Sequence, residues 1–469
     1  MKKKVLSIFL MLIVGIFIFS GCTNGLLGGP ELTDPITSNG DLSVQKGNYL
    51  YFANGYTNSA NLVKGDNKLG KVKHSALYRA ELDSDGNLQY DEEGNLIKVE
   101  LLVSKIVGFE NGGIYIFDDK IYFASPNDEQ DKTGSVDFTK LDFYSANLNG
   151  TNIQRIYKTE VGSKNIRYQF YKFGGVVYLA VYDSANLYIV DVTTNAVKKV
   201  ADGVSNVAMP KVTEYVCTES QDSDTLTDAQ KYIYYARTAV KTDNVETGNV
   251  LAMVSITTGQ ETVIAKNATY QAIDFNGGNL IYTQRLINED ISYYYTAPYV
   301  NASINTSEAV KLTQQSFSNA VLVLNFENGN YRGLLTTNAS GYMVVVKPIV
   351  GGVAQFDVLN EDTKLTPIKV YGDDIYCYNE DKELFVLNYK TKELKQISNK
   401  DNETLYFDML VNIDTTNGYV YVYEEYVGDN DVKGYYLVRY KTTLTDVEEA
   451  EVLGTILPEH IKTEEESGD

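Results

Sequence analysis

A strand motif that recurs along the chain limits the available folds more than any other feature. Each copy is a turn followed by an aliphatic residue and a tyrosine, as in residues 47–51. Clear copies lie at residues 47–52, 119–123, 174–178, 231–235, 277–282, 372–376 and 417–421, and a weaker copy lies at 328–331. Two further apolar runs follow each copy and another precedes it, with turn residues such as Asn149-Gly150 between them. The pattern predicts repeating units of four short strands.

Repeating units of this kind indicate a β-propeller. One four-stranded meander cannot bury both of its faces, whereas packing against neighbours in a closed ring covers them. We therefore predict an all-β chain with a single propeller over residues 42–453, built from eight four-stranded blades, with seven blades as the alternative. The chain has 38 Tyr and no Trp. We interpret the tyrosines mainly as packing between blades, because aromatic side chains fill pleated surfaces well.

One strand and turn has a more specific counterpart. Residues 143–152, together with the looser copies at 187–191 and 384–388, resemble the repeat of a bacterial propeller family of unknown function. That family is related to the YWTD propellers of lipoprotein receptors. The resemblance implies a propeller. The receptor propellers have six blades and the Trp of their name, so their binding chemistry is not expected here.

The first 22 residues predict where the chain resides. Lysines at residues 2–4 precede an apolar run over residues 5–19, which is too short for a membrane span. The run ends in Ser20-Gly21-Cys22, which resembles the lipobox of bacterial lipoproteins, with Phe19 in place of the usual Leu. The resemblance implies that residues 1–21 are a signal peptide and that Cys22 carries a diacylglycerol. An ordinary secretory signal or an N-terminal anchor helix is the alternative.

The mature chain is then expected on the extracytoplasmic face of the cell membrane, held there by the lipid on Cys22. Residues 22–41, rich in Gly, Asn, Pro and Thr, predict the lipidated cysteine and a flexible tether. Residues 454–469 include three consecutive glutamates and predict an acidic tail. The propeller is expected to lie between the tether and the tail.

Composition excludes several kinds of function. The formal net charge of -21 argues against nucleic acid as a partner, because phosphate binding needs clustered cations. His74 and His460 have no partner at a spacing typical of a triad or a metal site, so no cofactor is expected. Cys217 and Cys377 lie in apolar runs and are interpreted as buried free thiols, with a disulfide as the alternative.

One acidic loop has the spacing of a calcium site. Glu81, Asp83, Asp85 and Glu92 occupy positions 1, 3, 5 and 12 of an EF-hand-like loop, with Gly86 at position 6. Carboxylate oxygens that converge on a tight turn suit a hard cation such as Ca²⁺. The flanking residues predict strands instead of helices, so two ordinary solvated hairpin turns are the alternative.

No sequence motif identifies a ligand or a reaction. We expect a non-enzymatic binding or interaction module for a protein or glycan ligand, with binding residues unknown. The polar loops at residues 130–137 and 219–230 are places where a partner could bind. The alternatives are a carboxylate-based hydrolase or lyase acting on extracellular polysaccharide, and an envelope assembly scaffold.

Overall fold

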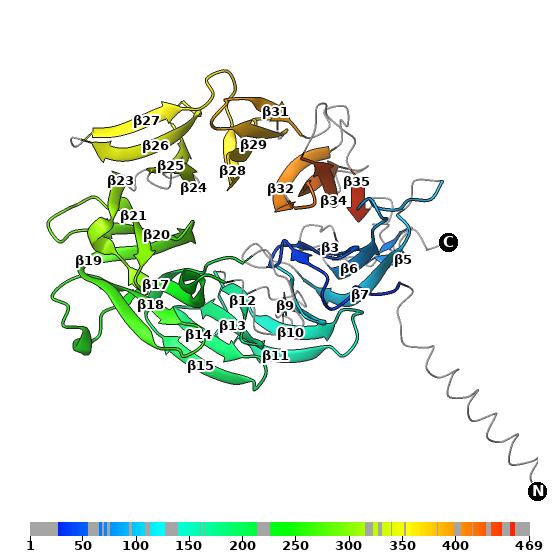
Figure 1. The fold of residues 1–469 in the computed structure, drawn as a ribbon, viewed down its shortest axis with the longest axis horizontal. Coiled ribbons are helices and arrows are strands. Elements are labelled where there is room, and N and C mark those ends of the chain that lie inside the picture. Colours follow the sequence, from blue (N-terminus) through cyan, green and yellow to red (C-terminus); the bar gives the residue numbers. More distant parts are fainter. Residues whose placement is uncertain are drawn as a thin grey trace, which may run out of the picture.

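The computed structural model describes most of the region between Leu27 and Gly454. The described residues are 27–54, 65–67, 70–72, 76–92, 96–107, 113–126, 139–159, 161–163, 165–212, 226–314, 322–326, 331–338, 340–350, 353–381, 383–397, 405–414, 416–427, 433–442 and 451–454. Most of them belong to strands, and the sheets stand side by side around a ring (Figure 1). The predicted signal peptide, Cys22 and the predicted tail beyond Gly454 lie outside the described residues.

The first three sheets follow the chain order. The first has the strand order β1-β2-β3-β6-β7, and the next two have four strands each. The first contains β1 (Ile36–Thr37), β2 (Ser43–Lys46), β3 (Tyr49–Ala53), β6 (Ala76–Glu81) and β7 (Val99–Ile106), with a separate hairpin of β4 (Gly65–Asn67) and β5 (Gly70–Val72). The second contains β8 (Tyr115–Phe117), β9 (Lys120–Pro126), β10 (Leu141–Asn147) and β11 (Gln154–Lys158). The third contains β12 (Arg167–Phe173), β13 (Val176–Asp183), β14 (Asn186–Asp191) and β15 (Ala196–Ala201).

The next sheet is larger because one of its strands is long and its two halves pair with different neighbouring strands. Its strands are β16 (Val204–Ala208), β17 (Tyr232–Thr238), β18 (Asn249–Ser255), β19 (Glu261–Asn276), β20 (Asn279–Arg285), β21 (Tyr293–Val300), β22 (Ser303–Ile304) and β23 (Val310–Gln314). β19 pairs with β18 through residues 261–268 and with β20 through residues 269–276. The short 3₁₀ helices η2 (Asp228–Lys231), η3 (Lys241–Asp243) and η4 (Thr306–Glu308) lie in the connections.

Three further four-stranded sheets complete the ring. They are β24 (Leu322–Phe326), β25 (Tyr331–Thr337), β26 (Met343–Val350) and β27 (Val353–Val358); β28 (Thr366–Tyr371), β29 (Asp374–Tyr378), β30 (Leu384–Asn388) and β31 (Leu394–Gln396); and β32 (Leu405–Asp414), β33 (Tyr419–Val427), β34 (Lys433–Lys441) and β35 (Glu451–Gly454). The first strand of a sheet lies nearest the centre of the ring, as β12, β24 and β28 do relative to β15, β27 and β31 (Figure 1).

The hydrophobic core is divided among the interfaces between neighbouring sheets. One cluster contains Leu50 and Tyr78 of the first sheet together with Phe123 of the second and Tyr421 of the last. The first sheet is therefore packed on both sides, and the last sheet closes the ring against it. Most of the largest fully buried side chains are tyrosines, and several of these, such as Tyr51 in β3, belong to the recurring motif. The predictions of an all-β chain, of antiparallel four-stranded sheets and of a propeller-like arrangement are confirmed.

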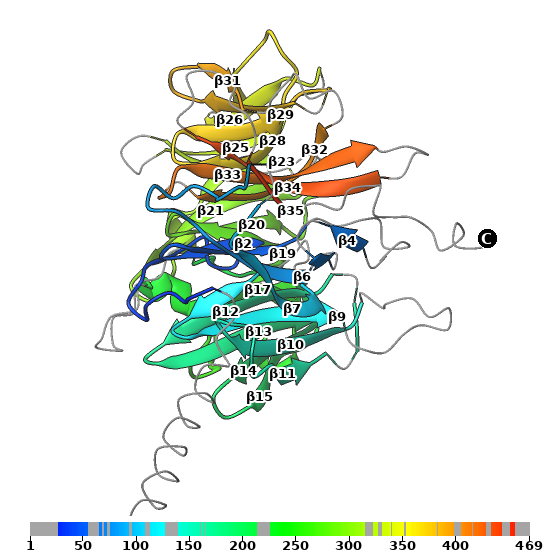
Figure 2. The same cartoon turned by 90° about the vertical axis from the view of Figure 1, so that its right-hand side faces the viewer.

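The connections divide between two faces of the ring. In a meander, the connections from first to second strand and from third to fourth strand lie at one edge, which we call the turn face. The second-to-third and sheet-to-sheet connections lie at the opposite edge, which we call the loop face. Figure 2 shows the β4–β5 hairpin, part of a second-to-third connection, projecting from the loop face. On the turn face, Gly150 has a φ of 76°, and a Cβ there would come within 2.3 Å of the Leu102 carbonyl oxygen in the first sheet.

The predicted tether over residues 22–41 is wrong for its second half. β1 pairs with β2, and Thr37 Oγ1 donates a hydrogen bond of 2.8 Å to Asp414 Oδ2 in β32. The side-chain amide of Asn39 bonds both the backbone N–H and the carbonyl of Ile116, at 2.7 and 3.1 Å. Polar side chains thus fix this segment to the neighbouring strands, and a segment held in this way needs no apolar period. Among the described residues, no helix is long and apolar enough to cross a membrane.

Candidate functional site

The structure does not bring the four predicted calcium ligands together. Asp83 Oδ1 accepts hydrogen bonds from the backbone N–H groups of Asn87 and Asp85, at 2.9 and 2.8 Å. These bonds, the one from Asn87 first, lower the pKa of Asp83. Within the described ranges, which include Glu81, Asp85 and Glu92, no three His, Cys, Asp or Glu side chains are placed to hold a metal ion. Asp83 therefore stabilises a turn, and the calcium prediction is not supported.

The other residues singled out from the sequence give little chemistry. His74, His460, Cys217 and the loop at residues 130–137 lie outside the described residues. Cys377 is a buried free thiol, as interpreted from the sequence, and burial raises the pKa of that thiol well above its usual range. Its surroundings make it a small hydrophobic side chain and not a nucleophile.

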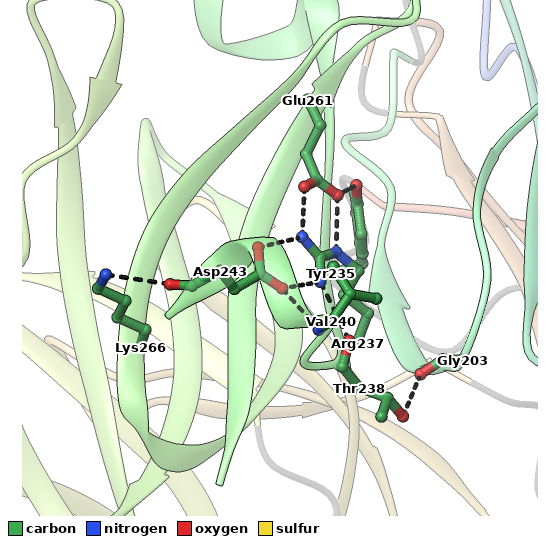
Figure 3. Close-up of polar contacts among 8 residues, drawn as sticks. All are labelled: Gly203, Tyr235, Arg237, Thr238, Val240, Asp243, Glu261 and Lys266. Carbon is green, nitrogen blue, oxygen red and sulfur yellow. Dashed lines mark hydrogen bonds and ion pairs between the residues drawn. The ribbon is translucent and has the colours of Figure 1, made fainter. Parts of the chain in front are cut away.

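The densest polar network surrounds Arg237 in β17 (Figure 3). Its guanidinium bonds Asp243 Oδ2 at 2.7 Å and Oδ1 at 3.0 Å, and Glu261 at 2.8 and 2.5 Å. A further bond of 3.0 Å goes to the Thr238 carbonyl oxygen. Tyr235 donates to the same Glu261 carboxylate. An arginine has five N–H donors, and all five are used here.

The Arg237 network therefore has a structural task. It fixes η3, in the connection between β17 and β18, to the strand β19 that carries Glu261. The hydrogen bond from Arg237 lowers the pKa of Asp243 to about 2. Because every N–H of the guanidinium is already hydrogen-bonded, Arg237 has no donor left for a ligand.

A second group of charged residues does have side-chain groups available to a ligand. The central charge cluster, as we call it, comprises Asp41, Arg167, Lys211, Asp274 and Lys369. Each comes from a first strand or its immediate neighbour in sequence: Asp41 precedes β2, Arg167 begins β12, Lys211 follows β16, Asp274 lies in β19 and Lys369 in β28. Of these strands, β12 and β28 are seen on the inner side of the ring in Figure 1. The fold therefore draws together charges that are hundreds of residues apart in the sequence.

A local irregularity sets the direction of two members of the cluster. The pairing register shifts between Ala272 and Asp274 in β19, and between Pro367 and Lys369 in β28. A β-bulge of this kind re-aims the side chain that follows it and is frequent beside functional sites. Asp274 and Lys369 both lie two residues before the end of their strand, so they occupy the same level of the ring.

The electrostatics of the cluster link its members. Burial lowers the pKa of Lys369; the charge of Asp41 opposes this shift and that of Lys211 adds to it. Burial raises the pKa of Asp274, against a hydrogen bond from the Phe275 backbone and the charges of Lys211 and Arg167. Both residues keep some contact with solvent, since Asp274 is exposed and Lys369 is half-buried. The protein around them still removes enough water to disfavour their charged forms.

The cations of the cluster differ from Arg237 in what they bond. Arg167 Nη1 donates to the Val207 carbonyl oxygen at 3.2 Å. Within the described part of the chain, no ion pair joins Lys369, Lys211 or Arg167 to a carboxylate. Three cations against two carboxylates give a local positive excess in a chain whose formal net charge is -21. Such a group can bind an anion while its carboxylates accept hydrogen bonds from hydroxyl groups.

The sequence analysis missed this cluster, although a signal was present. Lys369 and Asp274 each follow an isoleucine and stand three residues before a glycine turn. A charged side chain between apolar neighbours, three residues before a glycine turn, is the feature that marks them.

Comparison with known proteins assigns no family to this chain. No protein-family model matches the chain, and no curated protein matches it. Among solved structures, AztD from Citrobacter koseri is 10% identical, covers 81% of this chain and 93% of its own, and has a TM-score of 0.38. An oligogalacturonate lyase from Vibrio parahaemolyticus is 13% identical over 68% of this chain and 86% of its own, with a TM-score of 0.35. TolB from Acinetobacter baumannii is 9% identical over 74% and 79%, with a TM-score of 0.26.

These solved structures are propeller-like proteins. At such low identities and TM-scores they carry no argument about a site, a ligand or a reaction. The resemblance to the YWTD-related family stays a prediction.

Proposed function

We propose that this chain is a lipoprotein, anchored through Cys22 to the extracytoplasmic face of the cell membrane, whose propeller binds a ligand without transforming it. The ligand class that best fits the central charge cluster is a glycan that carries carboxylate groups. The cations would bind the carboxylates, and Asp274 and Asp41 would accept hydrogen bonds from sugar hydroxyl groups. This combination of charges fits an acidic sugar better than a simple anion, which the two carboxylates would repel.

We further propose that the propeller has eight blades. The support comes from β19, whose two halves pair with different neighbours. Dividing the large sheet at that strand gives β16-β17-β18 with the first half of β19, and the second half with β20-β21-β23. With the five-stranded first sheet counted as one blade, the division gives eight units, and β1 and β22 are additions at their edges.

The observation that carries the ligand proposal is the contrast between the cluster and the Arg237 network. Arg237 bonds two carboxylates with four of its five donors and the Thr238 carbonyl oxygen with the fifth. Lys369 has no carboxylate partner among the described residues, and burial together with the charge of Lys211 lowers the pKa of Lys369. Proteins retain such costly charges mostly where function uses them, which is why perturbed groups that gather in one place point to a binding site.

The test is calorimetric titration of the purified chain with polygalacturonate, and with dextran as a neutral control. We expect binding of the acidic polymer alone, and weaker binding at higher salt because the attraction is screened. Replacing Lys369 by Met should weaken binding by about tenfold to a hundredfold, since a charge-assisted hydrogen bond contributes about 1.5–3 kcal/mol. Lys199→Met is the matched control, because Lys199 is exposed on the outer strand β15 and pairs with Asp202.

Two results would oppose the proposal. If Lys369→Met and Lys199→Met bind the acidic polymer equally, the central cluster is not the site. If the unaltered chain releases new reducing ends from the polymer, it is a polysaccharide-active enzyme and not a binding module.

A further inference from the structure

The N-terminal segment is fixed to the turn face from its first described residue. Leu27 is buried, and its carbonyl oxygen accepts a hydrogen bond of 3.4 Å from Arg79 Nη2. Further along, Lys46 Nζ donates to the carbonyl oxygens of Leu32 and Asp34, at 2.9 and 3.1 Å. Lys46 is the last residue of β2 before the turn into β3. These contacts place residues 27–35 along the turn face.

Only a short stretch of chain separates this segment from the predicted lipid. Residues 23–26 lie between Cys22 and Leu27. Five steps from one Cα atom to the next span at most about 18 Å, even when the chain is fully extended. A strand such as β10, which runs from one face of the ring to the other and has 7 residues, is about 23 Å long. The chain is therefore too short to carry the lipid from Leu27 to the loop face.

We infer that the turn face lies on the lipid bilayer and that the loop face points away from it. This step rests on the lipidated Cys22 of the proposed function. The loop face would then present connections such as residues 202–203 and 286–292 to the surroundings. The lipid anchor, on the opposite face, would not obstruct them.

Apolar side chains near the attachment point suit this arrangement. Leu32, in the N-terminal segment, is 51% exposed. Ile97, in the β6–β7 connection, is 40% exposed, and Ile153, just before β11, is 42% exposed. Aliphatic groups at a bilayer interface strengthen the binding of a lipid-anchored protein. The loop face also exposes Leu286 and Ile287, so the length of the chain, and not apolar surface alone, decides the orientation.

Two matched positions at the ends of β11 test the inference. Ile153 lies on the turn face, and Val161, which is 57% exposed, lies on the loop face. The lipidated full chain with Cys217→Ser receives a fluorophore at Ile153→Cys or at Val161→Cys, while Cys377 is buried. The chain is reconstituted into vesicles of phosphatidylcholine and phosphatidylglycerol that contain a lipid with a nitroxide on its headgroup. We expect quenching at least about twofold stronger at residue 153 than at residue 161, because the ~18 Å span of residues 22–27 holds the turn face, and not the loop face, against the bilayer.

A longer tether is the control for the cause. With about 20 Gly and Ser residues inserted between Leu26 and Leu27, the root-mean-square span of the insert is about 25 Å, and the difference in quenching should disappear. A difference that survives this insertion would overturn the argument from chain length. Equal quenching in the original chain, or stronger quenching at residue 161, would overturn the orientation.

The failure of the anchor itself would look different. Cys22→Ser should leave the protein off the vesicles altogether. If the unaltered chain, expressed in bacteria, is not recovered with membranes, the proposed lipid anchor fails and the orientation fails with it. If it is recovered with membranes and only the quenching pattern is wrong, the proposed anchor stands and the orientation alone is lost.

Discussion

Among the residues that the structure describes, three buried arginines pair with carboxylates, but they connect different parts of the fold. Arg237 binds Asp243 in the β17–β18 connection and Glu261 in β19, a strand of its own sheet. Arg79 and Arg439 each pair with a carboxylate of their own sheet and then reach the turn of the next sheet. The same ion-pair chemistry thus fastens a loop in one place and joins neighbouring sheets in the other two.

Arg79 and Arg439 occupy equivalent positions in the first and last sheets. Arg79 stands opposite Tyr51 in β3 and Glu100 in β7, and Arg439 stands opposite Tyr421 in β33 and Glu451 in β35. Each guanidinium also lies over the ring of a second tyrosine. Arg79 lies 5.0 Å from the ring centre of Tyr49, and Arg439 lies 3.9 Å from that of Tyr419. The stacked ring and the carboxylate together fix the direction of the arginine.

The two arginines differ in what else holds the interface that they cross. Arg79 Nη1 donates to the Leu148 carbonyl oxygen at 3.5 Å, in a sheet that follows directly in the chain. Arg439 Nη2 donates to the Gly86 carbonyl oxygen at 3.0 Å and so joins the last sheet to the first. No connecting segment links those two sheets, because one lies near each end of the chain. Non-covalent contacts alone close the ring there, and Arg439 is among the most buried of them.

The largest effect is expected for Arg439→Met. It removes a fully buried charge whose partner Glu451 would remain partly buried and unpaired, and breaking such a pair costs about 3–5 kcal/mol. Equilibrium denaturation in urea should show this loss, and Lys199→Met, an exposed site, should change stability by less than about 0.5 kcal/mol. A loss below about 1 kcal/mol for Arg439→Met would mean that the arginine does not secure the closure.

Arg79→Met should cost less, about 2–3 kcal/mol, because the chain itself links the first and second sheets. It also removes the hydrogen bond to the Leu27 carbonyl oxygen. We therefore expect limited proteolysis to cut near residue 27 several times faster than in the unaltered chain. If stability falls but the cleavage rate near residue 27 does not change, Arg79 joins the sheets without fixing the N-terminal segment.

For Arg237→Met we expect a smaller and more local effect, of about 1–3 kcal/mol for the carboxylates left without their donor. Hydrogen exchange should accelerate first at Val240, whose backbone N–H bonds Asp243 Oδ2 at 2.8 Å, before the rest of the sheet is affected. Uniform acceleration across β17 and β18 would contradict a local role. The ordering of the three variants is the sharpest test of the distinction between closing the ring and fastening a loop.

The sequence predicted the repeated unit because its cause is local. The turn, the aliphatic residue and the tyrosine reappear as the second strand of a sheet, for instance in β3 and β33. The same reasoning placed turns such as Asn149-Gly150 correctly, because glycine at positive φ is a property of a few neighbouring residues. Local periodicity thus gave the sheets and their order.

The rest depends on contacts between residues far apart in the chain. The sequence predicts a tether at Thr37 because nothing near it in the chain reveals its bond to Asp414. Lys369 and Asp274 share a level of the ring only once the register and the bulges of β28 and β19 are known. The equivalence of Arg79 and Arg439 was visible in principle, since both follow the leucine of their strand by two residues. Their bonds to the next sheet were not, because those bonds need the closed ring.

The smallest expected effect concerns pH and the Arg237 network alone. The hydrogen bond from Arg237 lowers the pKa of Asp243 from 3.8 to about 2. A carboxyl group with a lowered pKa in the folded state stabilises the fold above the pKa of the unfolded chain, and this contribution is lost as the pH falls through the folded value. The stability contributed by Asp243 should therefore be complete above pH ~4 and decline toward pH ~2.

In urea denaturation over that range, Asp243→Asn should show a shallower loss of stability than the unaltered chain, whereas Asp202→Asn, an exposed control, should follow it. Parallel curves for all three proteins would mean that the Arg237–Asp243 pair contributes no stability that depends on pH. The acid sensitivity of the fold would then have to come from other carboxylates.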